Sequence, residues 1–268
     1  MRLRQWIEVV RMDEFGGMDT PVHRLDARAK TITTLVFIVA VMSFPRYEVS
    51  ALMPFLLYPT ALIAIGRIPP GYILRKILLA APFALVIGMF NPFFDRQTVL
   101  TAGKLGISAG WLSFASIMLR FVLTVGAALA LVSCTGIHRL GAGMERMRVP
   151  RVFVGQLLFL HRYLFVVADE ASRMMRGLEL RLAPAGSLRL RVYGSLAGHL
   201  FLRAINRADR VHRAMISRGF DGEIRTLRRT RLRGGDWVFM FAWTLFFAAA
   251  RKWNLAECLG RLFIREAS

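Results

Sequence analysis

The apolar residues of this chain are gathered into long uncharged runs that are separated by short polar segments. A helix that crosses a bilayer needs roughly 20 mostly apolar residues. Five runs approach this length, at residues 30–46, 49–66, 77–94, 111–133 and 237–250. Proline lies inside the second and third runs, where a membrane helix tolerates a kink if neighbouring groups satisfy its backbone. The pattern therefore predicts about five membrane-spanning helices.

Between the fourth and fifth runs the apolar positions follow a different pattern, with spacings of three and four that are typical of amphipathic helices. One such helix is expected between Pro150 and Pro184, and a second should stop at Gly219 or Gly222. The first stripe consists of Phe153, Leu157, Leu160, Leu164, Ala168, Ala171 and Met175, and the second of Leu196, Leu200, Ala204, Ala208, Val211 and Met215. The expected fold class is all-α: a polytopic membrane helix bundle with long amphipathic helices between spans four and five.

Charge sets the expected orientation. From Arg139 to Arg233 the chain has 20 arginines, no lysine and seven acidic residues. Because positively charged loops stay in the cytoplasm, this region and the N-terminus should both be cytoplasmic. We expect three regions: four spans in 1–138, cytoplasmic arginine-rich helices in 139–235, and the last span with a C-terminal tail in 236–268. The protein should reside in the cell (inner) membrane as a multi-pass protein, and the position of the tail stays open.

Composition supports a membrane protein and argues against a cleaved signal peptide. The 268 residues are 55% hydrophobic, with a mean hydropathy of +0.46 and a net charge of +20. The N-terminus has no apolar segment of the kind that a signal peptide requires. Two cysteines, Cys134 and Cys258, define neither a disulfide framework nor a metal site, so apolar packing is expected for both.

No motif in the sequence predicts catalysis. Phosphate-binding loops, dinucleotide fingerprints, zinc-protease motifs and nucleophile elbows are missing, and the five histidines show no ligand spacing. No catalytic residue, metal site or cofactor is therefore expected. Arg120 lies deep in the fourth run, where an arginine costs about 3 kcal/mol. It should pair with a carbonyl or a carboxylate, or face a water-filled groove; the alternative is a role in a polar path.

The basic helices have three possible interpretations: a lipid-facing surface, a nucleic-acid site, or a docking module for an acidic cytoplasmic protein. Few aromatic residues alternate with the arginines, which weakens the nucleic-acid interpretation. Ser217-Arg218-Gly219 favours docking, because an arginine complements the negative end of a helix and a following glycine lets the chain turn away. Arg218 would then project past the helix end toward a carboxylate of the partner.

Three segments give the sequence a resemblance to a known family. HRLDARAK (23–30), VPRVFVGQLLFLHRYLFVVADEASRM (149–174) and RADRVHRAMISRGFDG (207–222) are similar to segments of the T component of energy-coupling factor (ECF) transporters, most closely the CbiQ type of cobalt and nickel importers. The resemblance implies a non-catalytic transmembrane subunit. It would bind two copies of an ABC-type ATPase, a substrate-binding membrane subunit and a small accessory membrane subunit, without nucleic acid.

The resemblance also implies two coupling helices, each of which ends in an arginine that docks into one ATPase. Arg218, with Ser217 and Gly219, matches the second signature. The first matches Leu180-Arg181-Leu182, which departs from the small-Arg-Gly pattern but closes its helix before Pro184; Met175-Arg176-Gly177 is the rival. The transported substrate is expected to be cobalt or nickel. Alternatives are a vitamin transporter, a membrane enzyme that acts on lipids, and a membrane-tethered nucleic-acid-binding protein.

Overall fold

The computed structural model describes residues 16–45, 49–90, 98–102, 105–181, 190–222 and 232–252. These residues divide into two compact units. The bundle unit contains the described residues of 12–143 and 230–268, and the α9–α10 unit contains those of 144–229. Each unit has its own packing and is described by itself.

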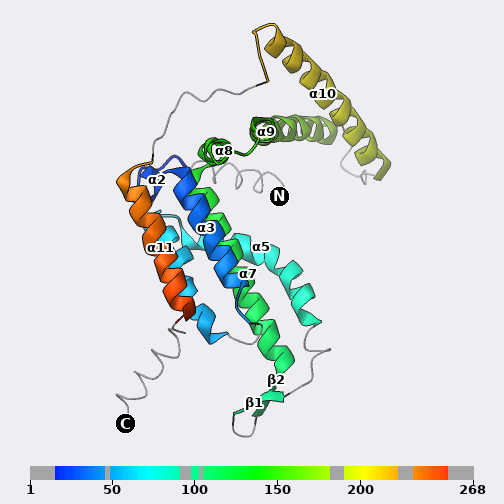
Figure 1. Cartoon of the computed structure of the whole chain (residues 1–268). Helices are drawn as coiled ribbons and strands as arrows, with labels where there is room; N and C mark the ends of the chain where they lie inside the picture. The colour runs from blue at the N-terminus through cyan, green and yellow to red at the C-terminus, as the bar shows by residue number, and fades with distance from the viewer. Residues whose placement is uncertain are drawn as a thin grey trace. The chain divides into compact units, whose positions relative to one another are not determined.

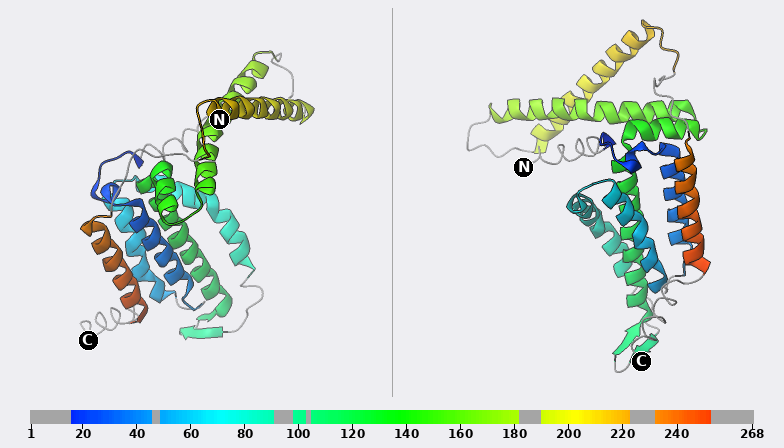
Figure 2. Two further views of the ribbon diagram at one scale, coloured as in Figure 1. Left: turned by 45° about the horizontal axis from the view of Figure 1, so that its top comes forward. Right: turned by 90° about the vertical axis from the view of Figure 1, so that its left-hand side faces the viewer.

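The bundle unit is built from helices around α7. Its elements are α2 (Pro21–Arg24), α3 (Ala27–Met42), the 3₁₀ helix η1 (Ser50–Leu56), α4 (Leu57–Ile65), α5 (Pro70–Met89), α7 (Ala109–Thr135), the first seven residues of α8 (Ile137–Arg146) and α11 (Gly234–Lys252). Helix α7 packs against α3, α4 and α5, while α3 lies between α7 and α11. Figure 2 shows α3, α7 and α11 running side by side, so segments from both ends of the sequence form one bundle.

An aromatic cluster fills the core between α3, η1, α4 and α11. Phe37 lies with its ring centroid 4.8 Å from that of Tyr58 and 5.4 Å from that of Phe247, and Phe55 stacks on Phe247 at 5.8 Å. The Tyr58 hydroxyl is hydrogen-bonded to the Thr34 hydroxyl at 2.8 Å, which satisfies both polar groups in the core. The rings fix how α11, the last described helix, packs on the first spans.

Polar contacts hold the helix ends of the same unit together. Asp26 caps α3, because its carboxylate accepts a hydrogen bond from the backbone N–H of Arg28. The backbone N–H of Asp26 donates to the Asp236 carboxylate of α11 at 2.8 Å. The Lys30 ammonium donates to the Cys134 carbonyl near the end of α7 at 3.0 Å. The HRLDARAK segment thus connects α3 to α7 and α11, and a cation near the C-terminus of α7 complements its dipole.

The predicted apolar runs all coincide with helices, with two differences in detail. The second run is not one α-helix: Pro54 lies in η1, which passes into α4 at Leu57. The third helix begins at Pro70, seven residues earlier than the predicted start. Proline is favourable in the first turn, where its missing N–H has no partner to lose. Because of the early start, α5 also contains Arg75 and Lys76, the two charged residues that directly precede the apolar run.

Three helices are long and apolar enough to cross a membrane by length and composition: Pro70–Met89, Gly110–Thr135 and Arg151–Glu179. Ser50–Ile65 is a shorter apolar segment. Many large apolar side chains on the bundle unit are exposed, among them Leu79 at 73% and Phe83 at 74%. Large exposed apolar surfaces are unusual for a protein surrounded by water and are expected for one in lipid.

The predicted all-α membrane helix bundle is confirmed. In the described residues the only strands are β1 (Thr98–Ala102) and β2 (Leu105–Ser108), which form a small antiparallel hairpin before α7. The pattern of apolar residues does not predict this hairpin.

The α9–α10 unit consists mainly of two long helices, α9 (Arg151–Glu179) and α10 (Leu190–Ile216), which pack against each other. Helix α9 starts directly after Pro150 and ends before Pro184, as predicted. Although α9 has the length and composition of a span, its last eleven residues include the five charged residues Asp169, Glu170, Arg173, Arg176 and Glu179. Since each buried charge in a bilayer is costly, these residues count against a position of the end of α9 in a bilayer core.

Candidate functional site

The C-terminal end of α10 is closed by a Schellman motif. The N–H of Phe220 donates to the Met215 carbonyl at 3.0 Å, and the N–H of Gly219 donates to the Ile216 carbonyl at 2.9 Å. Gly219 adopts φ +78°, the left-handed conformation that this motif requires at its C′ position. Among the described atoms, none would lie within 4 Å of a Cβ at Gly219, so the need for glycine is conformational. The predicted helix stop at Gly219 is confirmed.

This geometry places Arg218 at the last position before the chain turns. Ser217, Arg218 and Gly219 are all exposed, and the Ser217 hydroxyl donates back to the Arg213 carbonyl at 3.0 Å. Within the described part of the chain Arg218 has no ion pair, whereas Arg213, on the same helix, pairs with Asp209. The guanidinium of Arg218 is therefore exposed and available to an outside carboxylate.

The turn after Arg218 is anchored to α9. Phe220, the residue after Gly219, places its ring edge-on against Phe159 of α9, with centroids 6.5 Å apart. A hydrophobic contact by the residue after the glycine commonly accompanies a Schellman motif. The position of the Arg218 backbone is thus set by both helices of the unit.

The end of α9 separates the two rival positions for the first arginine. Leu180 is the C-cap, and the Arg181 N–H donates to the Leu178 carbonyl, so Arg181 lies just past the helix end. Arg176 is exposed within the last helical turns. Gly177 is helical and is not among the glycines with positive φ, so it does not turn the chain as Gly219 does. Arg181 lies two residues after Glu179, the last residue of α9, as Arg218 lies two residues after Ile216, the last residue of α10. Arg181 is not followed by a glycine.

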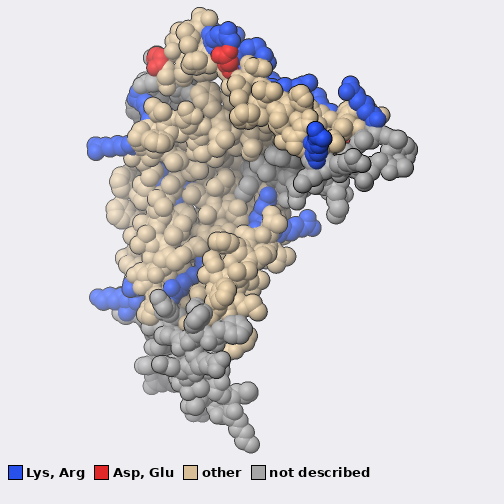
Figure 3. Space-filling model, turned by 90° about the vertical axis from the view of Figure 1, so that its right-hand side faces the viewer, with Lys and Arg blue, Asp and Glu red and all other residues tan. Residues whose placement is uncertain are grey.

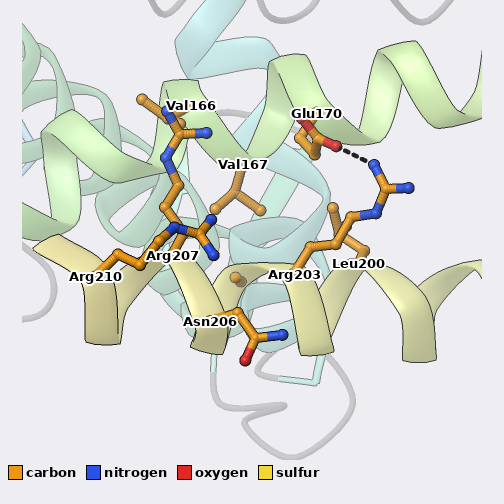
Figure 4. A pocket seen from close by; sticks show the side chains of 9 residues that line it. Val166, Val167, Glu170, Leu200, Arg203, Asn206, Arg207 and Arg210 are labelled. Atoms are coloured by element: carbon orange, nitrogen blue, oxygen red, sulfur yellow. Dashed lines mark hydrogen bonds and ion pairs between the residues drawn. The ribbon is translucent and has the colours of Figure 1, made fainter.

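A basic pocket with a volume of about 260 Å³ lies between α9 and α10. Its lining includes Arg203, Arg207 and Arg210 of α10 and Glu170 of α9. In Figure 4 the three arginines extend from α10 toward α9, where Arg203 donates to the Glu170 carboxylate at 2.6 Å. Within the described residues Arg207 and Arg210 have no ion pair, so the pocket has an excess of positive charge.

Glu170 is held ionised by its neighbours. Its carboxylate also accepts a hydrogen bond from Arg173 at 2.8 Å, and the hydrogen bonds from Arg173 and Arg203 lower the pKa of Glu170 below its ordinary value. Sequence reasoning did not identify this pair, because 33 residues separate Glu170 from Arg203. The only signal for it was the pair of adjacent acidic residues Asp169 and Glu170 in an arginine-rich region.

Next to the basic pocket lies an apolar groove with a volume of about 640 Å³. The groove and the pocket share Val167, Ala204 and Arg207 in their linings. The groove residues of α10 include the predicted stripe positions Ala204, Ala208, Val211 and Met215, together with Arg207 and His212. The groove residues of α9 are different from its predicted stripe: Val152, Gly155, Gln156, Phe159, Tyr163 and Val167.

The stripe predicted on α9 is only partly buried: Ala168 is buried, whereas other stripe positions are exposed. Phe153 is 69% exposed and Leu160 65% exposed, and Leu164 is also exposed. The face of α9 toward α10 instead passes through Phe159, Tyr163 and Val167. Helix α9 therefore has apolar side chains both toward α10 and on exposed positions, and one apolar stripe is left for another partner or for lipid.

Side chains that could support catalysis or bind a metal are not grouped in the described residues. No set of three His, Cys, Asp or Glu side chains has the geometry of a metal site within the described ranges. Cys134 is buried as a free thiol in the core cluster, as expected, and Cys258 lies outside the described residues. Arg120 donates to the Phe44 and Pro45 carbonyls at 3.1 and 2.6 Å, which confirms the predicted carbonyl partner.

Basic side chains are spread widely over the surface of the protein. On the face in Figure 3, blue Lys and Arg side chains clearly outnumber red acidic ones, and a broad uncharged area lies between them. Charge alone therefore does not distinguish one arginine from the others, whereas the Schellman turn directly after Arg218 does.

Comparisons with known proteins agree with this arrangement. A family model described as CbiQ, cobalt transport protein, matches residues 18–228 and so includes helices of both units. The energy-coupling factor transporter transmembrane protein EcfT of Heliobacterium modesticaldum is 27% identical over 267 residues, which cover 92% of this chain and 98% of that protein. The cobalt transport protein CbiQ of Rhodobacter capsulatus is 33% identical over 87 residues, 32% of this chain and 36% of that protein.

A further relative is an uncharacterized protein of Methanocaldococcus jannaschii, 29% identical over 163 residues. That match covers 60% of this chain and 59% of the relative, so the chain spans less than two thirds of its length.

Proposed function

This chain belongs to the CbiQ family and is a T component of the energy-coupling factor type, and from this premise we propose that it transmits the motion of cytoplasmic ATPases to a substrate-binding membrane subunit. As a transport subunit it has no catalytic role of its own. Its partners are two copies of an ABC-type ATPase, the substrate-binding subunit and a small accessory membrane subunit.

The observation that carries this proposal is the geometry of Arg218. The residue is exposed, has no ion pair in the described part of the chain, and lies at a helix end that a Schellman motif and the Phe159–Phe220 contact hold in place. A guanidinium held in this way can enter a groove and form two hydrogen bonds to one carboxylate. Because the turn is fixed, force on the arginine is transmitted to α10 and, through the Phe220 contact, to α9.

Arg181 is proposed as the second anchor, on the end of α9. Its position after the C-cap corresponds to that of Arg218 after α10, and Gly177 next to Arg176 lacks the turn geometry that would favour the rival. Two arginines on two helix ends would give each ATPase one anchor.

The test is capture of the ATPases by the detergent-solubilised chain. Truncation of a buried, hydrogen-bonded charge at an interface costs about 2–5 kcal/mol, and charge reversal should cost at least as much. Arg218→Glu should therefore lose most of the ATPase. Arg191→Glu is a matched control, since Arg191 is an exposed arginine near the other end of α10 and the change in charge is identical. Equal retention by wild type and Arg218→Glu would contradict the docking role.

Arg181→Glu and Arg176→Glu in the same assay identify the first anchor. Loss of ATPase in Arg181→Glu alone supports our assignment, whereas loss in Arg176→Glu alone assigns the role to Met175-Arg176-Gly177. Strong, salt-sensitive binding to DNA without ATPase capture would instead favour a membrane-tethered nucleic-acid-binding protein.

Cobalt, or nickel, is the proposed substrate of the assembled importer. The support comes from the CbiQ family match and from the printed name of the Rhodobacter relative. We assign selection of the ion to the separate substrate-binding subunit. Uptake of labelled cobalt, nickel and vitamins by cells that contain the complete transporter distinguishes this from a vitamin T component.

We further propose that the region 139–235 and the N-terminus are cytoplasmic, with four spans in 1–138 and the last span and tail in 236–268. The support is the excess of arginine in 139–235. Modification of Arg218→Cys by a membrane-impermeant maleimide in inside-out but not right-side-out vesicles is the expected result.

A further inference from the structure

The juxtaposition of the basic pocket and the apolar groove in the α9–α10 unit is not explained by docking at Arg218. The pocket lining contains three arginines and one glutamate. Glu170 is already hydrogen-bonded to Arg203 and Arg173, so it is not available to neutralise Arg207 and Arg210. Within the described residues neither Arg207 nor Arg210 has an ion-pair partner, so their two guanidinium groups form a site for an anion with several oxygen acceptors.

The apolar groove begins where the pocket ends. Arg207 lines both cavities, together with Val167 and Ala204. Beyond these shared residues the groove runs past Val211 and Met215 to Phe220. The site therefore has a charged end and an apolar end in continuous contact, which is the shape and polarity of an amphiphile with an anionic head.

From this juxtaposition we propose that the α9–α10 unit binds one anionic phospholipid, with its phosphate between Arg207 and Arg210 and an acyl chain in the groove toward Met215 and Phe220. A membrane protein always has such lipids within reach, and the exposed side chains of Phe153 and Leu160 on α9 give the unit an apolar surface that suits the bilayer interface. Basic groups near anionic headgroups strengthen binding, and a groove between helices adds burial of the chain.

Selective retention of lipid by the full chain tests the proposal. The purified, delipidated protein in detergent is mixed with phosphatidylglycerol or with phosphatidylcholine of the same acyl chains, and bound lipid is counted by native mass spectrometry. Phosphatidylglycerol should be retained and phosphatidylcholine should not. Each arginine is expected to strengthen binding about fivefold, so Arg207→Gln with Arg210→Gln should weaken it by about thirtyfold.

The matched control is Arg191→Gln with Arg218→Gln, which removes two exposed arginines of the same unit that lie outside the pocket and have no ion pair among the described residues. This variant should retain phosphatidylglycerol like the wild type. The double replacement of Arg207 and Arg210 by lysine, which preserves charge, should restore part of the binding. Equal retention of both lipids, or an equal loss in the control variant, overturns the proposal.

A second variant separates a lipid from a soluble phosphate compound. Ala208→Trp places a large ring in the groove but leaves the arginines in place, so phosphatidylglycerol should be lost. If Ala208→Trp retains the lipid, or if inorganic phosphate alone stabilises the wild type against heat as much as the lipid does, the ligand is a soluble anion and the lipid assignment is wrong. Circular dichroism and monodisperse elution establish that each variant is folded.

This inference is independent of the proposed coupling role. The Arg207/Arg210 variant should still capture the ATPases, whereas Arg218→Glu should still retain the lipid. Loss of lipid selectivity alone would contradict only the lipid site, and loss of the Arg218 effect alone would contradict only the docking role.

Discussion

Two glycine-to-alanine substitutions in the α9–α10 unit should have opposite effects although the chemical change is the same. Gly219 has φ +78°, and an L-residue in the left-handed region costs roughly 1–2 kcal/mol. Gly177 lies inside α9, where alanine is favoured over glycine by about 0.5–1 kcal/mol. Among the described atoms, none lies within 4 Å of a Cβ built at either position, so steric clashes do not complicate the comparison.

The structure also says where the loss in Gly219→Ala should be observed. The amide of Phe220 donates to the Met215 carbonyl across the turn, and it should become exposed when the turn opens. A cost of roughly 1–2 kcal/mol corresponds to a fall in hydrogen-exchange protection of about 5-fold to 30-fold at this amide. Gly177→Ala should leave Phe220 unchanged and increase protection in the last turns of α9. Thermal unfolding in detergent gives the direction of each change in stability.

ATPase capture by the same two variants tests whether the stability of the turn after Arg218 affects docking. Gly219→Ala should weaken capture, because Arg218 is held less well, and Gly177→Ala should not. If Gly219→Ala has no effect on protection or capture, the Schellman turn does not position Arg218. If Gly177→Ala abolishes capture, the first anchor is Met175-Arg176-Gly177 and our preference for Arg181 is wrong.

Three further predictions concern stability. Arg148 has φ +67° at the end of α8, so Arg148→Gly should stabilise the protein by about 1 kcal/mol, measured by thermal unfolding. The pKa of Glu170 is lowered in the folded protein, so its contribution to helix pairing is fully present above the ordinary carboxyl pKa of about 4.3 and is lost as pH falls through the lower folded value. The protection factors of the α9 amides, which are corrected for the intrinsic pH dependence of exchange, should therefore fall on acidification, and Glu170→Gln should remove this fall. Tyr58→Phe removes the hydrogen bond to Thr34 and should cost about 0.6 kcal/mol, by unfolding in detergent.

The sequence by itself determined the helices, the class of protein and the tip of α10. Runs of apolar residues specify membrane helices because the bilayer leaves few other structures possible. Proline and glycine determine helix ends through local backbone conformation, so the start of α9 after Pro150 and the stop of α10 at Gly219 followed without tertiary information. The motifs that resemble ECF T components led to the correct family.

The turns at two helix ends with arginine could not be predicted from the local sequence. Arg67 and Arg148 both adopt positive φ at the ends of α4 and α8, positions where glycine is the usual residue. Sequence reasoning had no signal for these turns, because the strain of a non-glycine residue is accepted only when surrounding contacts require the turn.

Only the tertiary structure decided which faces and charges meet. Periodicity marked Phe153 and Leu160 of α9 as packing positions, yet they are exposed. Four positions of the α10 stripe, Ala204, Ala208, Val211 and Met215, line the groove against α9. The physical reason is that a helix with lipid or further subunits as partners has more than one apolar face, and the sequence does not say which partner each face meets. The Glu170–Arg203 pair, and with it the excess charge at Arg207 and Arg210, depends on the register between two helices, which local sequence does not specify.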